Sequence, residues 1–215
     1  MKIGIIRIDR MGDMLLTLPV IQSIKLSNPS YKIYVYASNK NVRVLNNFKY
    51  LDKIINIDKK NLKDESFDII FNFSPGWKSF FKFFVIKSKR KANLIFASRY
   101  KKKNYSKSLL AFFSKIFFKE TLYVDRKDKF KNNQTIHQTQ MMYDLVAKCN
   151  IAFKKNDILE KYLLEQKTIN SKKKICILHL SSKWINKYYD ENNFLELLNI
   201  LKSKFNIALT SDETT

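Results

Sequence analysis

The residues best suited to do chemistry in this sequence are a glycine and an aspartate near the N-terminus, Gly12 and Asp13. They end a short polar run, residues 9–13, which separates an isoleucine-rich segment from a helix-like one. A carboxylate in such a turn can cap a helix by accepting backbone N–H groups, or it can accept a proton as a general base. The pair alone does not decide between these roles, because no glycine-rich nucleotide fingerprint accompanies it.

The elements on either side of this turn must position Asp13. Residues 2–8 are rich in isoleucine, which predicts a buried parallel strand. Apolar residues then recur with helical spacing from Met14 to Leu26, and Pro19 must either begin a second helical segment or kink the first. In open α/β sheets, ligands bind at the carboxyl ends of the strands, so we expect Asp13 at the mouth of a crevice.

Further strands alternate with helices along the first half of the chain. Segments with the composition of strands are 32–37, 54–57 and 67–73, and a short helix is expected at 41–47. Another helix is expected over residues 137–148, with His137 as polar structure at its start. This alternation predicts a parallel, Rossmann-like α/β sheet.

Residues 6–19, IRIDRMGDMLLTLP, resemble the opening of glycosyltransferase family 9, the lipopolysaccharide heptosyltransferases. The family pattern there is [IV]-[IVR]-[RL]-x-x-x-x-G-D-x-[LV]-x-[TA]-x-P, and Gly12, Thr17 and Pro19 are in register with it. The resemblance implies that Asp13 is the general base, which deprotonates the acceptor hydroxyl that attacks the donor's anomeric carbon. It also implies that Gly12 and Thr17 bind substrate.

A second βαβ segment follows, with a buried strand expected at 174–180, a helix at 190–204 and a strand at 206–210. It resembles the start of the nucleotide-sugar-binding domain of the same family, although Leu180-Ser181 replaces the family's Pro-Gly and Tyr189 replaces a tryptophan. The resemblance implies that Ser181, Ser182 and Lys187 contact the donor pyrophosphate. A lysine and a loop rich in N–H groups would offset the charge of the departing diphosphate without a metal ion.

The resemblance implies a GT-B-type architecture with two Rossmann-like domains. We expect an N-terminal acceptor-side domain over residues 1–152, a linker over 153–173 and the start of the second domain over 174–215. A later family segment, D-[ST]-x-x-x-H-x-x-[AS], is absent, so we expect a truncated second domain. Such a half-domain would expose apolar surface and a bare strand edge.

Charge is the most unusual property of the composition. The 215 residues carry a formal net charge of +22, which attracts anionic partners, although a lysine-rich compositional bias alone can produce such a value. Residues 78–131 hold 17 Lys or Arg against three acids, interleaved with aromatic residues. This stretch is a solvated face over a Phe-rich core, a patch for anionic membrane surface, or a single-strand nucleic-acid groove. No RNP, KH or zinc motif supports the last interpretation.

Several classes of protein are not expected. The two cysteines, Cys149 and Cys176, are isolated, which favours packed thiols in a reducing compartment over a disulfide. His137 and His179 form no ligand cluster, so no metal site is expected. No apolar run approaches the roughly 20 residues of a spanning helix, and the mixed composition of the first residues leads us to expect no secretory signal. We therefore expect a cytoplasmic protein, in peripheral contact with the inner membrane at most.

The expected function, implied by the resemblance, is that of an inverting glycosyltransferase. It would move a heptose or related sugar from a nucleotide-diphosphate donor, ADP-heptose, to a lipopolysaccharide-core or similar glycolipid. The donor is a substrate, and no cofactor is expected. The alternative is a truncated, catalytically inactive basic module that binds anionic glycolipid, membrane surface or RNA, and the charge of the chain leaves it open.

Overall fold

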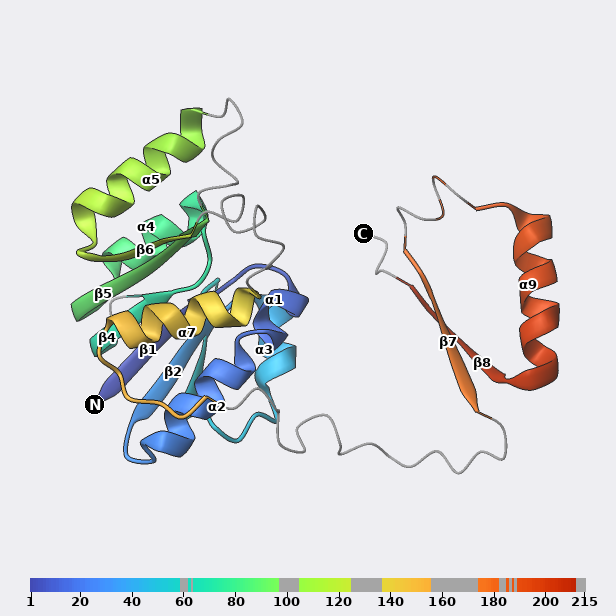
Figure 1. The fold of residues 1–215 in the computed structure, drawn as a ribbon, viewed down its shortest axis with the longest axis horizontal. Coiled ribbons are helices and arrows are strands. Elements are labelled where there is room, and N and C mark those ends of the chain that lie inside the picture. Colours follow the sequence, from blue (N-terminus) through green and yellow to red (C-terminus); the bar gives the residue numbers. More distant parts are fainter. Residues whose placement is uncertain are drawn as a thin grey trace. The chain divides into compact units, whose positions relative to one another are not determined.

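The computed structural model describes residues 1–58, 62, 64–96, 105–124, 137–155, 174–181, 185, 187 and 189–211. The chain divides into two compact units, Met1–Leu164 and Glu165–Thr215, and each is described by itself (Figure 1). Within the described residues, no helix combines the length and the apolar character needed to cross a membrane.

The first unit is built on a six-stranded sheet with the order β3-β2-β1-β4-β5-β6, in which every pair of neighbours is parallel. The strands are β1 Lys2–Arg7, β2 Lys32–Ala37, β3 Lys53–Asn56, β4 Ser66–Asn72, β5 Lys87–Phe96 and β6 Glu120–Val124. The strand order reverses beside β1, between β2 and β4. A crevice for ligands forms at such a switch point, at the carboxyl ends of the strands. The expected Rossmann-like parallel sheet is confirmed.

Helices cover both faces of this sheet. They are α1 Met11–Leu15, α2 Leu18–Ser27, α3 Asn39–Leu45, α4 Trp77–Val85, α5 Tyr105–Phe117 and α7 Gln138–Lys148. Successive side chains of β1 alternate between two cores, as the pleat of a strand requires. Ile3 and Ile5 pack with α2 and α7, whereas Ile6 packs with α4 and α5. Both faces of β1 are therefore buried, as its isoleucine-rich sequence predicts.

The expected break near Pro19 is a new helix rather than a kink. The helix α1 ends at Leu15, and α2 starts at Leu18 with Pro19 as its second residue. Proline is tolerated in a first helical turn, because the N–H groups of that turn have no partner within the helix.

The strands β5 and β6 were not indicated by the sequence. The first residues of β5 are Lys87-Ser88-Lys89-Arg90-Lys91, and these charges conceal a strand whose apolar part starts at Ala92. The charges are accommodated because they meet acids on the neighbouring strands. Lys89 pairs with Asp68 at 2.8 Å, and Arg90 pairs with Glu120.

The second unit contains β7 Ile175–Leu180, α9 Glu191–Lys204 and β8 Asn206–Ser211, with the two strands parallel. The predicted βαβ segment is therefore confirmed. Asp190 caps α9 by accepting the N–H of Asn193 at 2.9 Å. The prediction that the first strand is buried is wrong, since Ile177 is 67% exposed. A two-stranded sheet with one helix cannot cover both of its faces, and the apolar exposure expected for this unit is observed.

Candidate active site

The Asp13 carboxyl lies at the carboxyl end of β1, on the short helix α1. Arg10 occupies the capping position of α1, so Asp13 is the third residue of the helix and not its cap. Its side chain is 27% exposed. The backbone therefore places a partly exposed carboxylate at the switch point of the sheet, where the sequence predicted one.

A buried arginine holds this carboxylate. The Arg7 side chain, the last of β1, has no solvent exposure, and its Nη2 lies 3.3 Å from Asp13 Oδ1. Its Nε donates to the Asp13 backbone oxygen at 3.1 Å, and its Nη1 donates to the Phe73 backbone oxygen. Asp9 Oδ2 is 3.5 Å from Nη1. One guanidinium thus joins the ends of β1 and β4 to the first turn of α1, which its fixed fork of donors suits.

Gln138, the first residue of α7, completes this group from a distant part of the sequence. With its amide oriented to satisfy both neighbours, Nε2 donates to Asp13 Oδ1 at 3.2 Å and Oε1 accepts from Arg7 Nη2. The preceding residue, His137, caps α7 by accepting the N–H of Thr139 at 3.3 Å. The role of His137 in starting the helix is therefore confirmed.

The backbone around Asp13 is fixed by two buried polar side chains. Thr17 Oγ1 donates to the Asp13 backbone oxygen at 2.9 Å, and Thr17 has no solvent exposure. Asn41 Nδ2, from α3, donates to the backbone oxygens of Arg7 and Asp9 at 3.1 Å each. Thr17, which the family resemblance assigns to substrate binding, is in contact with the protein interior here and supports the turn that carries Asp13.

Gly12 has no structural requirement to be glycine. A Cβ added to it would meet no atom within 4 Å, and no glycine among the described residues has a positive φ. Glycine in a helix costs up to about 1 kcal/mol relative to alanine. The space around its Cα is open.

This arrangement is chemically suited to accept a proton. Arg7 and Gln138 both approach Asp13 Oδ1, and among the described residues none donates to Oδ2. A general base needs an oxygen within hydrogen-bond reach of the hydroxyl it deprotonates. Oδ2 belongs to a partly exposed side chain, so it is the oxygen available to such a hydroxyl.

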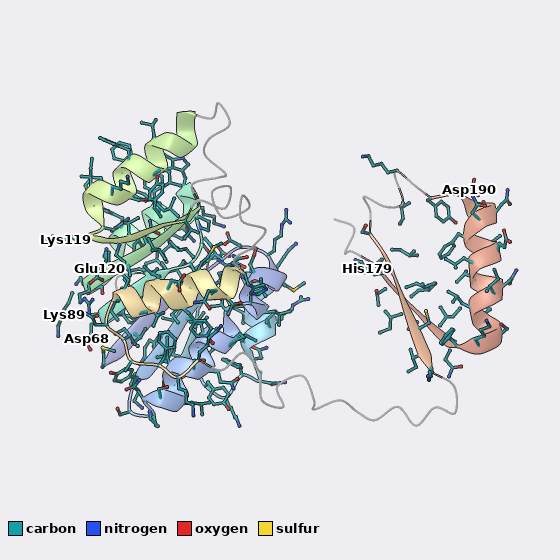
Figure 2. The ribbon with its side chains drawn as sticks, viewed as in Figure 1. Asp68, Lys89, Lys119, Glu120, His179 and Asp190 are labelled. Carbon is teal, nitrogen blue, oxygen red and sulfur yellow. The ribbon has the colours of Figure 1, made fainter. Side chains whose placement is uncertain are left out.

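The residues predicted to bind diphosphate lie in the second unit. Ser181 directly follows β7, and its backbone oxygen accepts the N–H of Ile185 at 2.9 Å, as in a helical turn. Lys187 is exposed, and Ser182 lies outside the described residues. At the end of β7, His179 Nδ1 is 3.1 Å from Thr210 Oγ1 of β8 (Figure 2). Ser181 and Lys187 therefore both follow the carboxyl end of a parallel strand.

A cavity of about 350 Å³ opens at the opposite edge of the first sheet, at the amino ends of β5 and β6. Residues 88–91 and 117–120 line it, and Lys119 and Glu120 mark its position in Figure 2. Its cations are largely engaged, since Arg90 pairs with Glu120 and Lys91 Nζ donates to two backbone oxygens at the end of α4. Burial lowers the pKa of Lys91. No group of three or more metal-ligating side chains occurs in the described parts of either unit.

No family model matches the sequence, and no curated protein matches it either. Solved structures do match. E. coli heptosyltransferase WaaC with ADP superposes with a TM-score of 0.67 over 97% of this chain and 66% of its own, at 17% identity. A family 9 glycosyltransferase from Veillonella parvula matches with a TM-score of 0.63 over 97% of this chain and 61% of its own, at 12% identity. This chain therefore has the fold of a family 9 glycosyltransferase.

The resemblance seen in the sequence is thus confirmed at the level of the fold. E. coli ADP-heptose heptosyltransferase II shares this family 9 fold with a TM-score of 0.57 over 97% of this chain and 64% of its own, at 12% identity. WaaC is also known in complex with ADP-2-deoxy-2-fluoro heptose, and that structure matches at 15% identity with a TM-score of 0.68. The chain spans about two thirds of the length of these structures.

Proposed function

We propose that the chain belongs to an inverting glycosyltransferase in which Asp13 is the general base. The observation that supports this role is the one-sided arrangement of the carboxylate. Arg7 and Gln138 approach one oxygen, and among the described residues none donates to the other oxygen of this partly exposed side chain. A cap or a purely structural ion pair does not require an oxygen that is left available in this way.

In the proposed reaction, Asp13 Oδ2 takes the proton of an acceptor hydroxyl as that oxygen attacks the anomeric carbon of the donor sugar. The bond from the anomeric carbon to the diphosphate breaks, and the configuration inverts. Lys187 with Ser181 and Ser182 offsets the negative charge that develops on the leaving diphosphate, so the proposed transfer is independent of a metal ion. Thr17 acts on Asp13 through the backbone, as a positioning residue.

The proposed donor is ADP-heptose, and the proposed acceptor is a lipopolysaccharide-core or similar anionic glycolipid. Support for the donor comes from two similar structures, which hold ADP and an ADP-heptose analogue. An acceptor of this kind places the reaction at the cytoplasmic face of the inner membrane, with the protein in peripheral contact. The high positive charge of the chain suits such an acceptor.

The test compares a catalytically active protein that contains this chain with its Asp13→Asn variant, which keeps the size of the side chain and an acceptor oxygen for Arg7 and Gln138. ADP release from ADP-heptose in the presence of a lipopolysaccharide-core acceptor measures turnover, and calorimetry measures ADP binding. We expect the variant to lose turnover by at least about a hundredfold, since general bases contribute about 10²- to 10⁴-fold. ADP affinity should be unchanged. Equal turnover of the two proteins would refute the role of Asp13.

The charge of residues 77–119 favours a second candidate, a non-catalytic basic module. This stretch has 13 Lys or Arg and no acid. Such a module would bind polyanions, including RNA, with an affinity that falls steeply as salt rises. Salt-tolerant binding of a nucleotide-diphosphate sugar would favour the enzyme instead.

A further inference from the structure

Two neighbouring helices of the first unit present a continuous apolar surface to solvent. Seven large apolar side chains of α4 and α5, each 42–61% exposed, form what we call the phenylalanine face. They are Phe81, Phe84 and Val85 of α4, and Leu109, Phe112, Ile116 and Phe117 of α5. The two helices lie side by side, with the ring centroids of Phe84 and Phe117 5.4 Å apart (Figure 1). Single exposed apolar residues are normal, but a contiguous patch across two helices indicates an interaction site.

The sequence of α4 explains why these rings point outward. Phe80 and Phe83 turn toward the sheet and fill the core beneath the helix, where they contact Phe118. Phe81 and Phe84 are each one residue further along, so the helical rotation carries them to the solvent side. Core formation therefore accounts for the inner pair of phenylalanines and not for the outer pair.

Aromatic contacts fix the two helices against each other beneath this surface. Trp77 stacks on Phe81, with centroids 5.7 Å apart, and meets Phe113 of α5 edge-on at 6.3 Å. Phe113 in turn stacks on Phe117 at 6.1 Å. The outward rings thus belong to a pre-formed surface, so little ordering is needed when a partner covers them.

Charge identifies the kind of partner. The helices α4 and α5 carry four lysines, Lys78, Lys82, Lys107 and Lys115, and no carboxylate of their own. Asp58 pairs with Lys78 and Lys82 of α4, which leaves the two helices with a net positive charge. A second copy of the chain on this face would bring two such pairs of helices together, and like charges across an interface are costly. The aliphatic members Val85, Leu109 and Ile116 are unsuited to base stacking, which disfavours single-stranded nucleic acid. Basic side chains around outward Phe and Leu are typical of helices that lie in an anionic membrane interface.

We propose that the phenylalanine face docks on an anionic lipid bilayer. The outward rings enter the boundary between headgroups and acyl chains, and lysines such as Lys78 contact the headgroups. The α4 helix follows β4 at the carboxyl edge of the sheet, the same edge that carries Asp13. The proposal deepens the peripheral contact stated above. It rests on the proposed function only for the identity of the membrane, because docking itself needs neither Asp13 nor the donor.

Co-sedimentation of the full chain with vesicles tests this proposal. Vesicles of phosphatidylcholine with 30% phosphatidylglycerol are compared with vesicles of phosphatidylcholine alone. Phe81→Ser and Ile116→Ser remove apolar area from the face, and each should weaken partitioning about tenfold. The matched control is Leu26→Ser, which changes a 46% exposed residue on α2.

Lys78→Glu tests the charge. This change alters the local charge by two units and should weaken binding about 30-fold. Lys32→Glu is its control, because the two lysines are 68% and 66% exposed and each lies 3.4 Å from an aspartate. Lys32→Glu should weaken binding several-fold less than Lys78→Glu.

The proposal is supported if the chain binds the anionic vesicles, if Phe81→Ser and Ile116→Ser weaken binding, and if Leu26→Ser does not. It is overturned if the chain does not bind, or if the face and control variants bind alike. It is also overturned if the chain is a dimer in solution that Phe81→Ser converts to a monomer while vesicle binding stays the same. ADP binding, measured on the same variants, should not change, so failure of docking is distinguishable from failure of the transferase proposal.

Discussion

Replacing the buried Arg7 by methionine is the change that best tests whether the site depends on its guanidinium. Methionine keeps most of the apolar stem but removes all donors. The Phe73 backbone oxygen then loses the donor that Arg7 supplies, and a buried polar group left unpaired costs about 1–3 kcal/mol. The Asp13 backbone oxygen also loses its bond from Arg7 but keeps the one from Thr17 Oγ1. The two carboxylates can rehydrate because their side chains are 27% and 34% exposed, so the lost ion pairs add little.

We therefore expect Arg7→Met to lower the free energy of unfolding by about 1–3 kcal/mol. Urea unfolding followed by circular dichroism measures this change, and Arg7→Lys should fall between wild type and Arg7→Met because lysine lacks the fork. Asp13→Asn is the matched control, and it should stay within about 1 kcal/mol of wild type because Arg7 keeps its backbone partners. If Arg7→Met is as stable as wild type within about 0.5 kcal/mol, the structural role assigned to the guanidinium is wrong.

Three further predictions concern glycine, acid stability and thiol reactivity. Gly4→Ala should destabilise the protein by about 1–3 kcal/mol, since the added Cβ would lie 2.9 Å from an isoleucine of β4. Gly12→Ala should be neutral or stabilising in the same urea assay, and it should weaken transfer because the family resemblance implies that Gly12 binds substrate. The pKa of Glu65 is lowered by hydrogen bonds from Lys2 and from a second lysine, so its contribution is present above its ordinary pKa of 4.5 and is lost as pH falls below it. Glu65→Gln should therefore destabilise at pH 7 and flatten the loss of stability between pH 5 and pH 3, and parallel pH profiles would contradict this. Burial, with the nearby Glu120 carboxylate, raises the pKa of the Cys149 thiol to about 12. Alkylation of this cysteine by iodoacetamide at pH 8 should therefore require unfolding, and rapid alkylation in the native protein would contradict its burial.

The local sequence was sufficient to predict the strands and turns around Asp13. The isoleucines of β1 and the alternation in β2 lie in short segments whose neighbours in the sequence are also neighbours in the fold. The strand β5 was not found, because its lysines are neutralised by residues on other strands, such as Asp68. No local pattern contains that information.

Only part of the candidate site could be predicted, because its other residues come together through contacts between segments distant in the sequence. Asp13 and Gly12 belong to one contiguous motif. Arg7 lies within that motif, but its side chain was assigned to a buried strand, and the clue to its role is a charged residue at the end of an otherwise apolar segment. Gln138 is adjacent to His137, which the sequence analysis did single out, yet its contact with Asp13 depends on how α7 returns across the sheet.

The return of α7 has a consequence for the order of events during synthesis. Thr139 Oγ1 donates to the Leu16 backbone oxygen at 3.1 Å across 123 residues of sequence, and Gln138 reaches Asp13 over a similar span. At about 5–20 residues per second, a ribosome needs roughly 6–25 s to make the chain between these partners. The residues around Asp13 are made well before α7, so their contacts with this helix form late. A nascent chain that does not yet include α7 can therefore pair β1 with β2 and β4, but it still lacks the contact of Gln138 with Asp13.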